Sequence, residues 1–246
     1  MATECNKSKA IVLAAIPIND HTQFVHLYTQ ECGRVTCRVP MATRGKRAST
    51  LRSTLTPLTV LEVILCGRQR DEIRSISEAQ VLLSPYMMTF GHPDKASQCL
   101  YMAELIDHTV REVEANPRLW DFMVGAIDTL AQCQEGWANF HLIFTCGLIK
   151  QLGFGIDTKD YAEGCQFDLR EGRFTTSPIM HPYYFNAASA AWFCRVFDTD
   201  YDHMDDLALS RSERASLLDM LLSFLALQIP EMGQLRSLEV LKTLFD

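Results

Sequence analysis

The stretch that decides the fold is Gly33–Thr54, GRVTCRVPMATRGKRASTLRST. Its first half alternates apolar and polar residues at a period of two, which predicts a half-buried strand over 34–40. The alternation then stops, and four basic residues follow with no acid among them: Arg44, Lys46, Arg47 and Arg52. Such a connector is typical of a surface that holds an anionic polymer, although a run of charge is more often a solvated loop.

Four further strands are expected around this one, over 7–16, 22–30, 58–66 and 70–80. Turn residues, including Gly33 and Gly67, separate them. Five short strands linked by hairpins predict a small closed barrel of the oligonucleotide-binding (OB) type, with a Src-homology-3-like barrel as the alternative. We prefer the OB type because the long connector lies between the third and fourth strands, where that barrel usually carries its helix.

The pattern becomes helical after Pro85. Helices are expected from Pro93, from Asn116-Pro117, over 137–152, over 187–198, from the capping box at Ser210 to Pro230, and over about 235–245. A small hairpin is expected at about 157–182. The predicted fold class is therefore α+β, with an OB-fold nucleic-acid-binding domain at 1–82 and a helical domain with a hairpin insertion at 83–246.

The composition is that of a globular protein, with 48% hydrophobic and 22% charged residues among 246. It contains no apolar run long enough to span a membrane and no recognisable signal peptide, so a cytoplasmic protein is expected. The nine cysteines are scattered and include no C-x-x-C pair. This spacing favours free thiols in a reducing compartment over a disulfide framework.

The charge is distributed unevenly along the chain. Residues 1–80 contain 11 Lys and Arg against 7 Asp and Glu, a net charge of +4, whereas residues 81–246 carry −11. The acidic part would repel a phosphate backbone. Any contact with nucleic acid is therefore expected in the first third of the chain.

The sequence contains little that indicates a catalytic or metal-binding site. No P-loop, dinucleotide fingerprint, zincin motif or nucleophile elbow occurs. His141 and Cys146 share an apolar helix and are interpreted as core residues rather than as a nucleophile pair. Cys165 and His181 lack the closely spaced partner cysteines that structural zinc requires. We therefore predict no catalytic residue, no metal and no cofactor.

The remaining signal points to nucleic acid. Arg34 and Arg38 share one face of their strand, because positions i and i+4 do so at a period of two. The turn between the fourth and fifth strands adds further charge, and two aromatic rings precede the basic strand. The predicted DNA-binding residues are Arg34, Arg38, Arg44, Lys46, Arg47, Arg52, Arg68, Arg70, Arg74 and Tyr28. Phe24 could also stack on bases, but we prefer core packing for it.

Several segments together resemble one family. They are Lys9-Ala10-Ile11-Val12-Leu13, Leu27-Tyr28-Thr29, Arg44-Gly45-Lys46-Arg47, Leu55-Thr56-Pro57-Leu58, Ala103-Glu104-Leu105, Gln151-Leu152-Gly153-Phe154 and Ser237-Leu238-Glu239-Val240-Leu241. In order and spacing they resemble the RecO family of bacterial recombination mediators, over nearly the whole chain.

The resemblance implies a function and partners. Family members bind single- and double-stranded DNA, anneal strands coated by single-stranded-DNA-binding protein, and work with RecR to load RecA, without catalytic residues. The resemblance also implies a pocket in the helical domain for the acidic, apolar tail of single-stranded-DNA-binding protein, with Lys150, Arg211 and Arg214 as candidates for its rim. It implies a nucleoid-associated bacterial protein.

Many members of the family hold zinc with four cysteines after the Leu-Gly-Phe segment. In this chain only Cys165 remains there, so zinc is not expected.

Two rival functions stay open. In the first, the chain is a protein-interaction adaptor whose barrel binds a protein partner and whose basic connector is solvated, since +4 is a modest charge for a DNA-binding region. In the second, it is a cysteine-dependent enzyme that uses Cys146 or Cys165.

Overall fold

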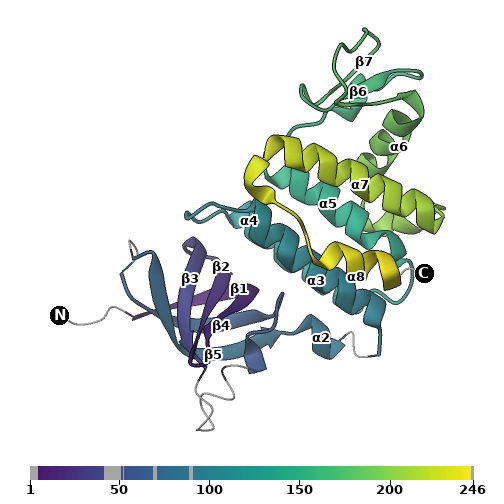
Figure 1. Ribbon diagram of the computed structural model, residues 1–246. Helices are drawn as coiled ribbons and strands as arrows, with labels where there is room; N and C mark the ends of the chain where they lie inside the picture. Colours follow the sequence, from purple (N-terminus) through teal and green to yellow (C-terminus); the bar gives the residue numbers. More distant parts are fainter. Residues whose placement is uncertain (1–4, 42–50, 52, 69–70, 89–90, 245–246) are drawn as a thin grey trace. The chain divides into compact units, whose positions relative to one another are not determined.

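In a computed structural model, the chain forms two compact units, residues 1–132 and 133–246 (Figure 1). The structure describes all residues except 1–4, 42–50, 52, 69–70, 89–90 and 245–246. The predicted domain boundary after residue 82 falls one residue before the end of the last barrel strand, whereas the first compact unit continues to Gln132 through two long helices.

The first unit begins with a closed five-stranded barrel in the order β1-β2-β3-β5-β4. The strands are β1 (Cys5–Asn19), β2 (Thr22–Thr29), β3 (Gly33–Pro40), β4 (Val60–Cys66) and β5 (Ile73–Leu83). The pairing of β3 with β5 is parallel, and the other four pairings are antiparallel. This is the predicted OB-type barrel, and the strands lie within a few residues of their predicted positions.

The side chains on one side of each strand form the barrel core, and buried residues alternate regularly with less buried ones along β3. Val25 and Leu27 of β2 and Val35 and Cys37 of β3 are buried there. The turn between these two strands requires a glycine: Gly33 has φ +67°, and a Cβ built on it would lie 2.3 Å from the carbonyl oxygen of Glu114. The β2–β3 turn therefore lies in close contact with the segment around Glu114, which follows the helix over residues 93–109.

The barrel is followed in the first unit by helices α2 (Pro85–Met88), α3 (Pro93–Thr109) and α4 (Pro117–Gln132). Both long helices begin with the predicted proline, whose missing N–H costs nothing in the first turn. The side chain of Asn116 accepts a hydrogen bond from the N–H of Leu119 at 3.1 Å and so caps α4. Helix α3 packs against β1 of the barrel.

The second unit is built around α5 (Phe140–Gln151), which packs against α6 (Ala187–Asp198) and α7 (Arg211–Gln228) (Figure 1). Residues Phe140 to Cys146 are all buried, as predicted for a central helix. The capping box predicted at Ser210 and Glu213 is present at the start of α7. Helix α8 (Ser237–Leu244) follows, and short 3₁₀ turns η1 to η4 link the helices at 137–139, 158–160, 201–206 and 230–232.

The predicted hairpin is a three-stranded sheet. Strands β6 (Gln166–Asp168) and β7 (Arg173–Thr175) pair as expected, and β8 (Tyr184–Phe185) adds to the other edge of β6. Phe167 lies at its centre, with ring centroids 4.8 Å from Phe174 and 4.6 Å from Phe193. Asp168 fixes the β6–β7 turn by accepting hydrogen bonds from the N–H groups of Arg170 and Glu171. Aromatic packing and this capped turn hold the insertion together.

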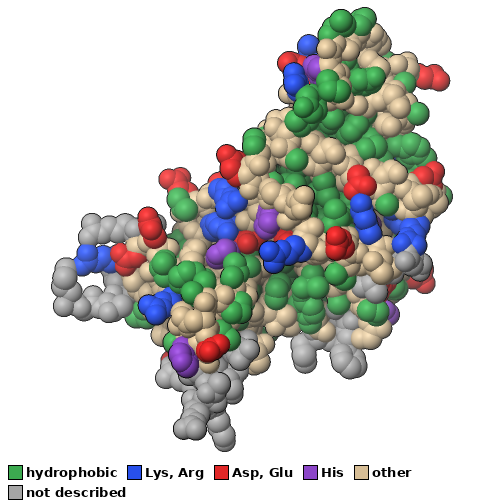
Figure 2. Space-filling model, in the orientation of Figure 1, with side chains coloured by type: hydrophobic (Ala, Val, Ile, Leu, Met, Phe, Trp, Pro, Cys, Tyr) green, Lys and Arg blue, Asp and Glu red, His purple; other side chains and the backbone are tan. Residues whose placement is uncertain are grey.

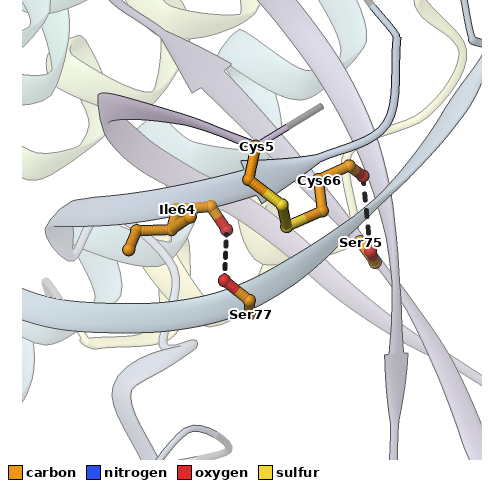
Figure 3. Close-up of a disulfide and its surroundings, with 5 residues drawn as sticks. All are labelled: Cys5, Ile64, Cys66, Ser75 and Ser77. Carbon is orange, nitrogen blue, oxygen red and sulfur yellow. Dashed lines mark hydrogen bonds between the residues drawn. A yellow bond between two sulfur atoms is a disulfide. The ribbon is translucent and has the colours of Figure 1, made fainter. Parts of the chain in front are cut away.

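The expectation that all cysteines are free was wrong. Cys5 and Cys66 form a disulfide that joins the first residue of β1 to the last residue of β4 (Figure 3). The two residues are register partners in the antiparallel β1–β4 pair, with Cα atoms 4.1 Å apart. The other seven cysteines form no disulfide. No helix in the described ranges is long and apolar enough to cross a membrane.

Candidate nucleic-acid interface

One end of the barrel carries a groove of about 550 Å³, which we call the barrel groove. All five strands or their ends contribute to it: its lining residues are Ile18, Asn19, Thr22, Phe24, Arg38, Cys66, Ile73, Arg74 and Ser75. Ile18 and Ile73 are 53% and 48% exposed, which is unusual for isoleucine. Figure 2 shows hydrophobic side chains exposed on the barrel and interspersed with Lys and Arg. The groove therefore combines apolar surface with positive charge.

Two turns border the barrel groove. In the β1–β2 turn, the side chain of Asn19 accepts a hydrogen bond from the N–H of His21 at 2.9 Å. In the β4–β5 turn, the carboxylate of Asp71 accepts one from the N–H of Arg68 at 2.6 Å. Gly67 opens this turn at φ +134°, and a Cβ there would come within 3.3 Å of the side chains of Asp71 and Arg74. The β4–β5 turn is the one whose basic residues were predicted from the sequence to contact DNA.

Phe24 lies in the barrel groove, which corrects the preference for core packing. It is on the outer face of β2, only partly buried, and its register partner on β3 is Arg38. Directly opposite residues on neighbouring strands have their Cβ atoms about 5 Å apart. An aromatic residue and an arginine thus occupy opposite positions on the two strands and both line the groove.

Tyr28 is not available for stacking, contrary to the prediction. It shares the outer face of β2 with Phe24 but has no exposed surface. Burial raises the pKa of Tyr28 to about 12, and the nearby carboxylate of Glu112 adds to the effect. The ring is therefore covered by protein within the first unit, where a base cannot reach it.

Arg34 also has a different role from the predicted one. Its guanidinium lies 2.6 Å from the carboxylate of Asp107 on α3, and both side chains are nearly buried, at 13% and 11% exposed. It also donates to the carbonyl oxygens of Asp107 and Val110. Arg34 does share the outer face with Arg38, as predicted, but it joins the barrel to α3 and does not belong to the exposed basic surface.

His26 completes the contact with Asp107. Its Nδ1 lies 2.9 Å from the carboxylate. Burial alone raises the pKa of Asp107, but the hydrogen bond from His26 and the charge of Arg34 outweigh burial and hold the pKa below its ordinary value. Two polar residues on the outer face of the barrel thus share one carboxylate of α3, a contact that sequence analysis missed.

The other predicted DNA-binding residues fall into two groups. Arg38 is exposed, Arg74 is partly buried with its guanidinium 3.8 Å from the sulfur of Cys32, and Arg68 lies in the β4–β5 turn. Arg38 and Arg74 line the barrel groove. Those outside the described residues are Arg44, Lys46, Arg47, Arg52 and Arg70.

Comparison with known proteins agrees with this architecture. Residues 1–85 match the family model described as Recombination protein O N terminal, and residues 92–239 match Recombination protein O C terminal. The chain is 31% identical to the DNA repair protein RecO of Bacteroides fragilis over 241 residues, which is 98% of this chain and 99% of the relative. The chain belongs to the RecO family. The protein of the same name in Porphyromonas gingivalis is 31% identical over 242 residues, which is 97% of this chain and 98% of the relative. The one in Azobacteroides pseudotrichonymphae is 28% identical over 242 residues, which is 98% of this chain and 99% of the relative.

This RecO-family chain has a second pocket, in its second unit, which we call the α7–α8 pocket. It measures about 190 Å³ and is lined by His141, Arg211, Arg214, Ala215, Leu218, Leu241 and Lys242. The family resemblance implied an apolar pocket with a basic rim in the helical domain, and two of the predicted rim residues, Arg211 and Arg214, line this one. Burial lowers the pKa of His141 to about 3, with the charge of Arg214 adding to the effect, so this ring is neutral at ordinary pH.

Lys150 does not belong to that rim. Its ammonium group donates to the carbonyl oxygen of Phe197 at 2.6 Å and lies 4.7 Å from the centre of the Phe197 ring. Lys150 therefore ties α5 to the end of α6. On the rim itself, Lys242 pairs with Asp219 at 2.6 Å, while Arg211 donates to the carbonyl oxygen of Lys242.

The described residues give no support to cysteine or metal chemistry in the RecO-family chain. Burial raises the pKa of the Cys146 thiol to about 12, so it holds its proton at neutral pH. Cys165 is buried beside the small sheet. Within the described ranges, no three His, Cys, Asp or Glu side chains are grouped so that they could hold a metal ion.

Proposed function

We propose that this RecO-family protein is a non-enzymatic recombination mediator that binds single-stranded DNA in the barrel groove. The observation that carries the proposal is the pairing of Phe24 with Arg38 on the groove wall, close to Ile73 and Arg74. Single-stranded DNA is held without reading its sequence when bases stack on aromatic side chains and cations follow the backbone. The groove supplies both kinds of group on one surface.

The proposal extends to annealing and to partners. Contacts to phosphates and stacking on bases do not depend on the DNA sequence. Such a groove therefore suits a protein that must bind single strands of any sequence. We propose that the protein also binds double-stranded DNA, anneals complementary strands coated by single-stranded-DNA-binding protein, and acts with RecR so that RecA is loaded indirectly. The bacterial cytoplasm, at the nucleoid, is the compartment in which we expect this activity.

A titration tests the DNA proposal. Labelled single-stranded DNA is titrated with the protein at two salt concentrations, and the wild type is compared with Arg38→Ala. If Arg38 contacts phosphate, the slope of log affinity against log salt becomes shallower by about 0.7. Arg173→Ala is the matched control, because Arg173 is an exposed strand arginine in the second unit. No binding at low salt, or equal losses in both variants, would contradict the proposal.

A protein-interaction adaptor is the second candidate function. The observation that favours it is the apolar surface around the groove, since Ile16, Ile18 and Ile73 are all more than two-fifths exposed. A groove built mainly for a protein partner would retain no single strands at low salt. The same titration therefore separates the two functions.

We further propose that the α7–α8 pocket takes the acidic, apolar tail of single-stranded-DNA-binding protein. Leu218 and Leu241 offer apolar surface to a hydrophobic tail residue, and Arg211 and Arg214 offer charge to its carboxylates. Calorimetry with a tail peptide at low salt is expected to show binding that Arg211→Ala weakens. Lys159→Ala, an exposed change elsewhere in the second unit, is the control. Absence of heat with the wild type would contradict this pocket assignment.

A further inference from the structure

The Cys5–Cys66 disulfide lies at the edge of the barrel groove. Cys66 is one of the groove's lining residues, together with Arg38 and Arg74. Its partner Cys5, at the start of β1, is exposed and is not among the lining residues. Cys66 itself is only partly buried. Small molecules can therefore reach the two sulfur atoms, and a bond between them is attached directly to the groove wall at Cys66.

The disulfide fastens the part of β4 from which the β4–β5 turn departs. Figure 3 shows Ser75 of β5 donating to the carbonyl oxygen of Cys66 at 3.3 Å, and Ser77 donating to that of Ile64 at 3.4 Å. The sulfur bridge adds β1 to this arrangement from the other side of β4. Three strands are thus held together at the position where Cys66 and Ser75 enter the groove.

We propose that Cys5 and Cys66 form a redox-modification site that sets the affinity of the barrel groove for single-stranded DNA, with the disulfide form binding more tightly. The inference rests on the proposed function of the groove. A binding surface that is already fixed loses less conformational freedom when its ligand arrives. In the dithiol form the start of β1 is joined to β4 by backbone pairing and by the partly exposed ion pair between Lys7 and Glu62, without the covalent bond at Cys66. The groove wall at Cys66 is then less firmly fixed, and it loses more conformational freedom when DNA binds.

The oxidant we assign is a hydroperoxide, with hydrogen peroxide as the probe. One thiolate attacks the O–O bond; a sulfur–oxygen bond forms and hydroxide leaves as water after taking a proton. The second thiol then attacks this sulfur, the S–S bond forms, and the sulfenic oxygen leaves as a second water. The two thiols lose two electrons and two protons, and one peroxide is reduced to two waters. Peroxides also damage DNA. Oxidation of the two cysteines would therefore raise the affinity of the groove for single-stranded DNA under the conditions in which DNA needs repair.

The test compares two preparations of the full chain, one reduced with a dithiol and one treated with hydrogen peroxide, both freed of reagent. Mass spectrometry of unreduced peptides establishes whether Cys5 and Cys66 are joined. Fluorescence anisotropy with a labelled single strand then gives the dissociation constant of each form. We expect the disulfide form to bind at least about fivefold more tightly, the lower end of usual coupling between two sites, and re-reduction to reverse the gain.

Cys5→Ser removes the bond without altering a lining residue of the groove, and it leaves every other cysteine in place. It is expected to bind like the reduced wild type under both treatments, with circular dichroism confirming its fold and Cys5→Ala as a second variant. Cys133→Ser, at a partly exposed cysteine of the second unit that forms no disulfide, is the control and is expected to keep the response.

Four results would overturn the inference: no Cys5–Cys66 peptide after peroxide treatment, equal affinities of the two forms with the bond confirmed, tighter binding by the reduced form, or a response that persists in Cys5→Ser. Absence of DNA binding in both forms is a different result. It overturns the proposed function, and the redox inference falls with it.

Discussion

The guanidinium of Arg34 and the carboxylate of Asp107 lie 2.6 Å apart, although 73 positions separate them in the chain. One belongs to the outer face of a barrel strand and the other to the first long helix. Their contact turns part of the barrel surface into an internal interface of the first unit. It also decides which of the predicted DNA-binding residues remain exposed.

Arg34→Ala is expected to destabilise the first unit. Removing one partner of a nearly buried ion pair leaves the other charge uncompensated, and we expect a loss of about 3 kcal/mol in the free energy of unfolding. Urea denaturation measures it. Lys7→Ala is the control, because the pair between Lys7 and Glu62 is exposed on the Lys7 side and such pairs contribute no more than about 1 kcal/mol. Similar small losses in both variants would show that the Arg34 contact is not structural.

The stability of the first unit is expected to depend on pH through Asp107. Its pKa is depressed in the folded state, so its contribution is present above the unfolded value of about 3.9 and is lost as the pH falls through the lower folded value. Asp107→Asn cannot titrate at this position. The difference in unfolding free energy between wild type and Asp107→Asn should therefore shrink below about pH 4. A difference that stays constant down to pH 2 would contradict this assignment.

Period-two alternation was enough to predict the barrel but not to choose between its outward-facing residues. Phe24 and Tyr28 lie on the same face of β2, four positions apart, and the alternation treats them alike. In the structure the two residues differ because the segment after α3 covers Tyr28, whereas Phe24 lines the groove. The partner of Arg34 lies on a helix far along the chain, so no local pattern could identify it. The Cys5–Cys66 bond likewise depends on the register between β1 and β4, which cysteine spacing does not report.

Phe24→Ala is expected to weaken binding of single-stranded DNA by about 1–3 kcal/mol, the usual contribution of one stacked base. The loss should change little with salt, because stacking releases no counterions. Anisotropy titrations at two salt concentrations measure both quantities. Val81→Ala, an exposed apolar change on β5 outside the groove lining, is the control. If the two variants bind equally well, Phe24 does not stack on bases.

The basic connector remains a sequence-based prediction. Replacing Arg44, Lys46 and Arg47 by alanine should make the salt slope of DNA binding shallower by up to about 2 if all three contact phosphate. Affinity should fall by a similar factor on all sequences, because phosphates carry no sequence information. Stability should change by no more than about 0.5 kcal/mol, as for most surface changes. An unchanged slope in the folded triple variant would assign the phosphate contacts to the groove and the β4–β5 turn instead.

The contacts between the barrel and α3 determine how the protein can be divided. A fragment that ends after β5 at Leu83 would contain every barrel strand, yet it would present the ring of Tyr28 to water and leave Arg34 and His26 without Asp107. Such a fragment would expose a charged and aromatic face that the intact chain keeps covered, and DNA could bind there for reasons unrelated to the natural site. A fragment that ends at Gln132 retains the covering helix. Measurements on a shortened chain therefore need the helix that carries Asp107.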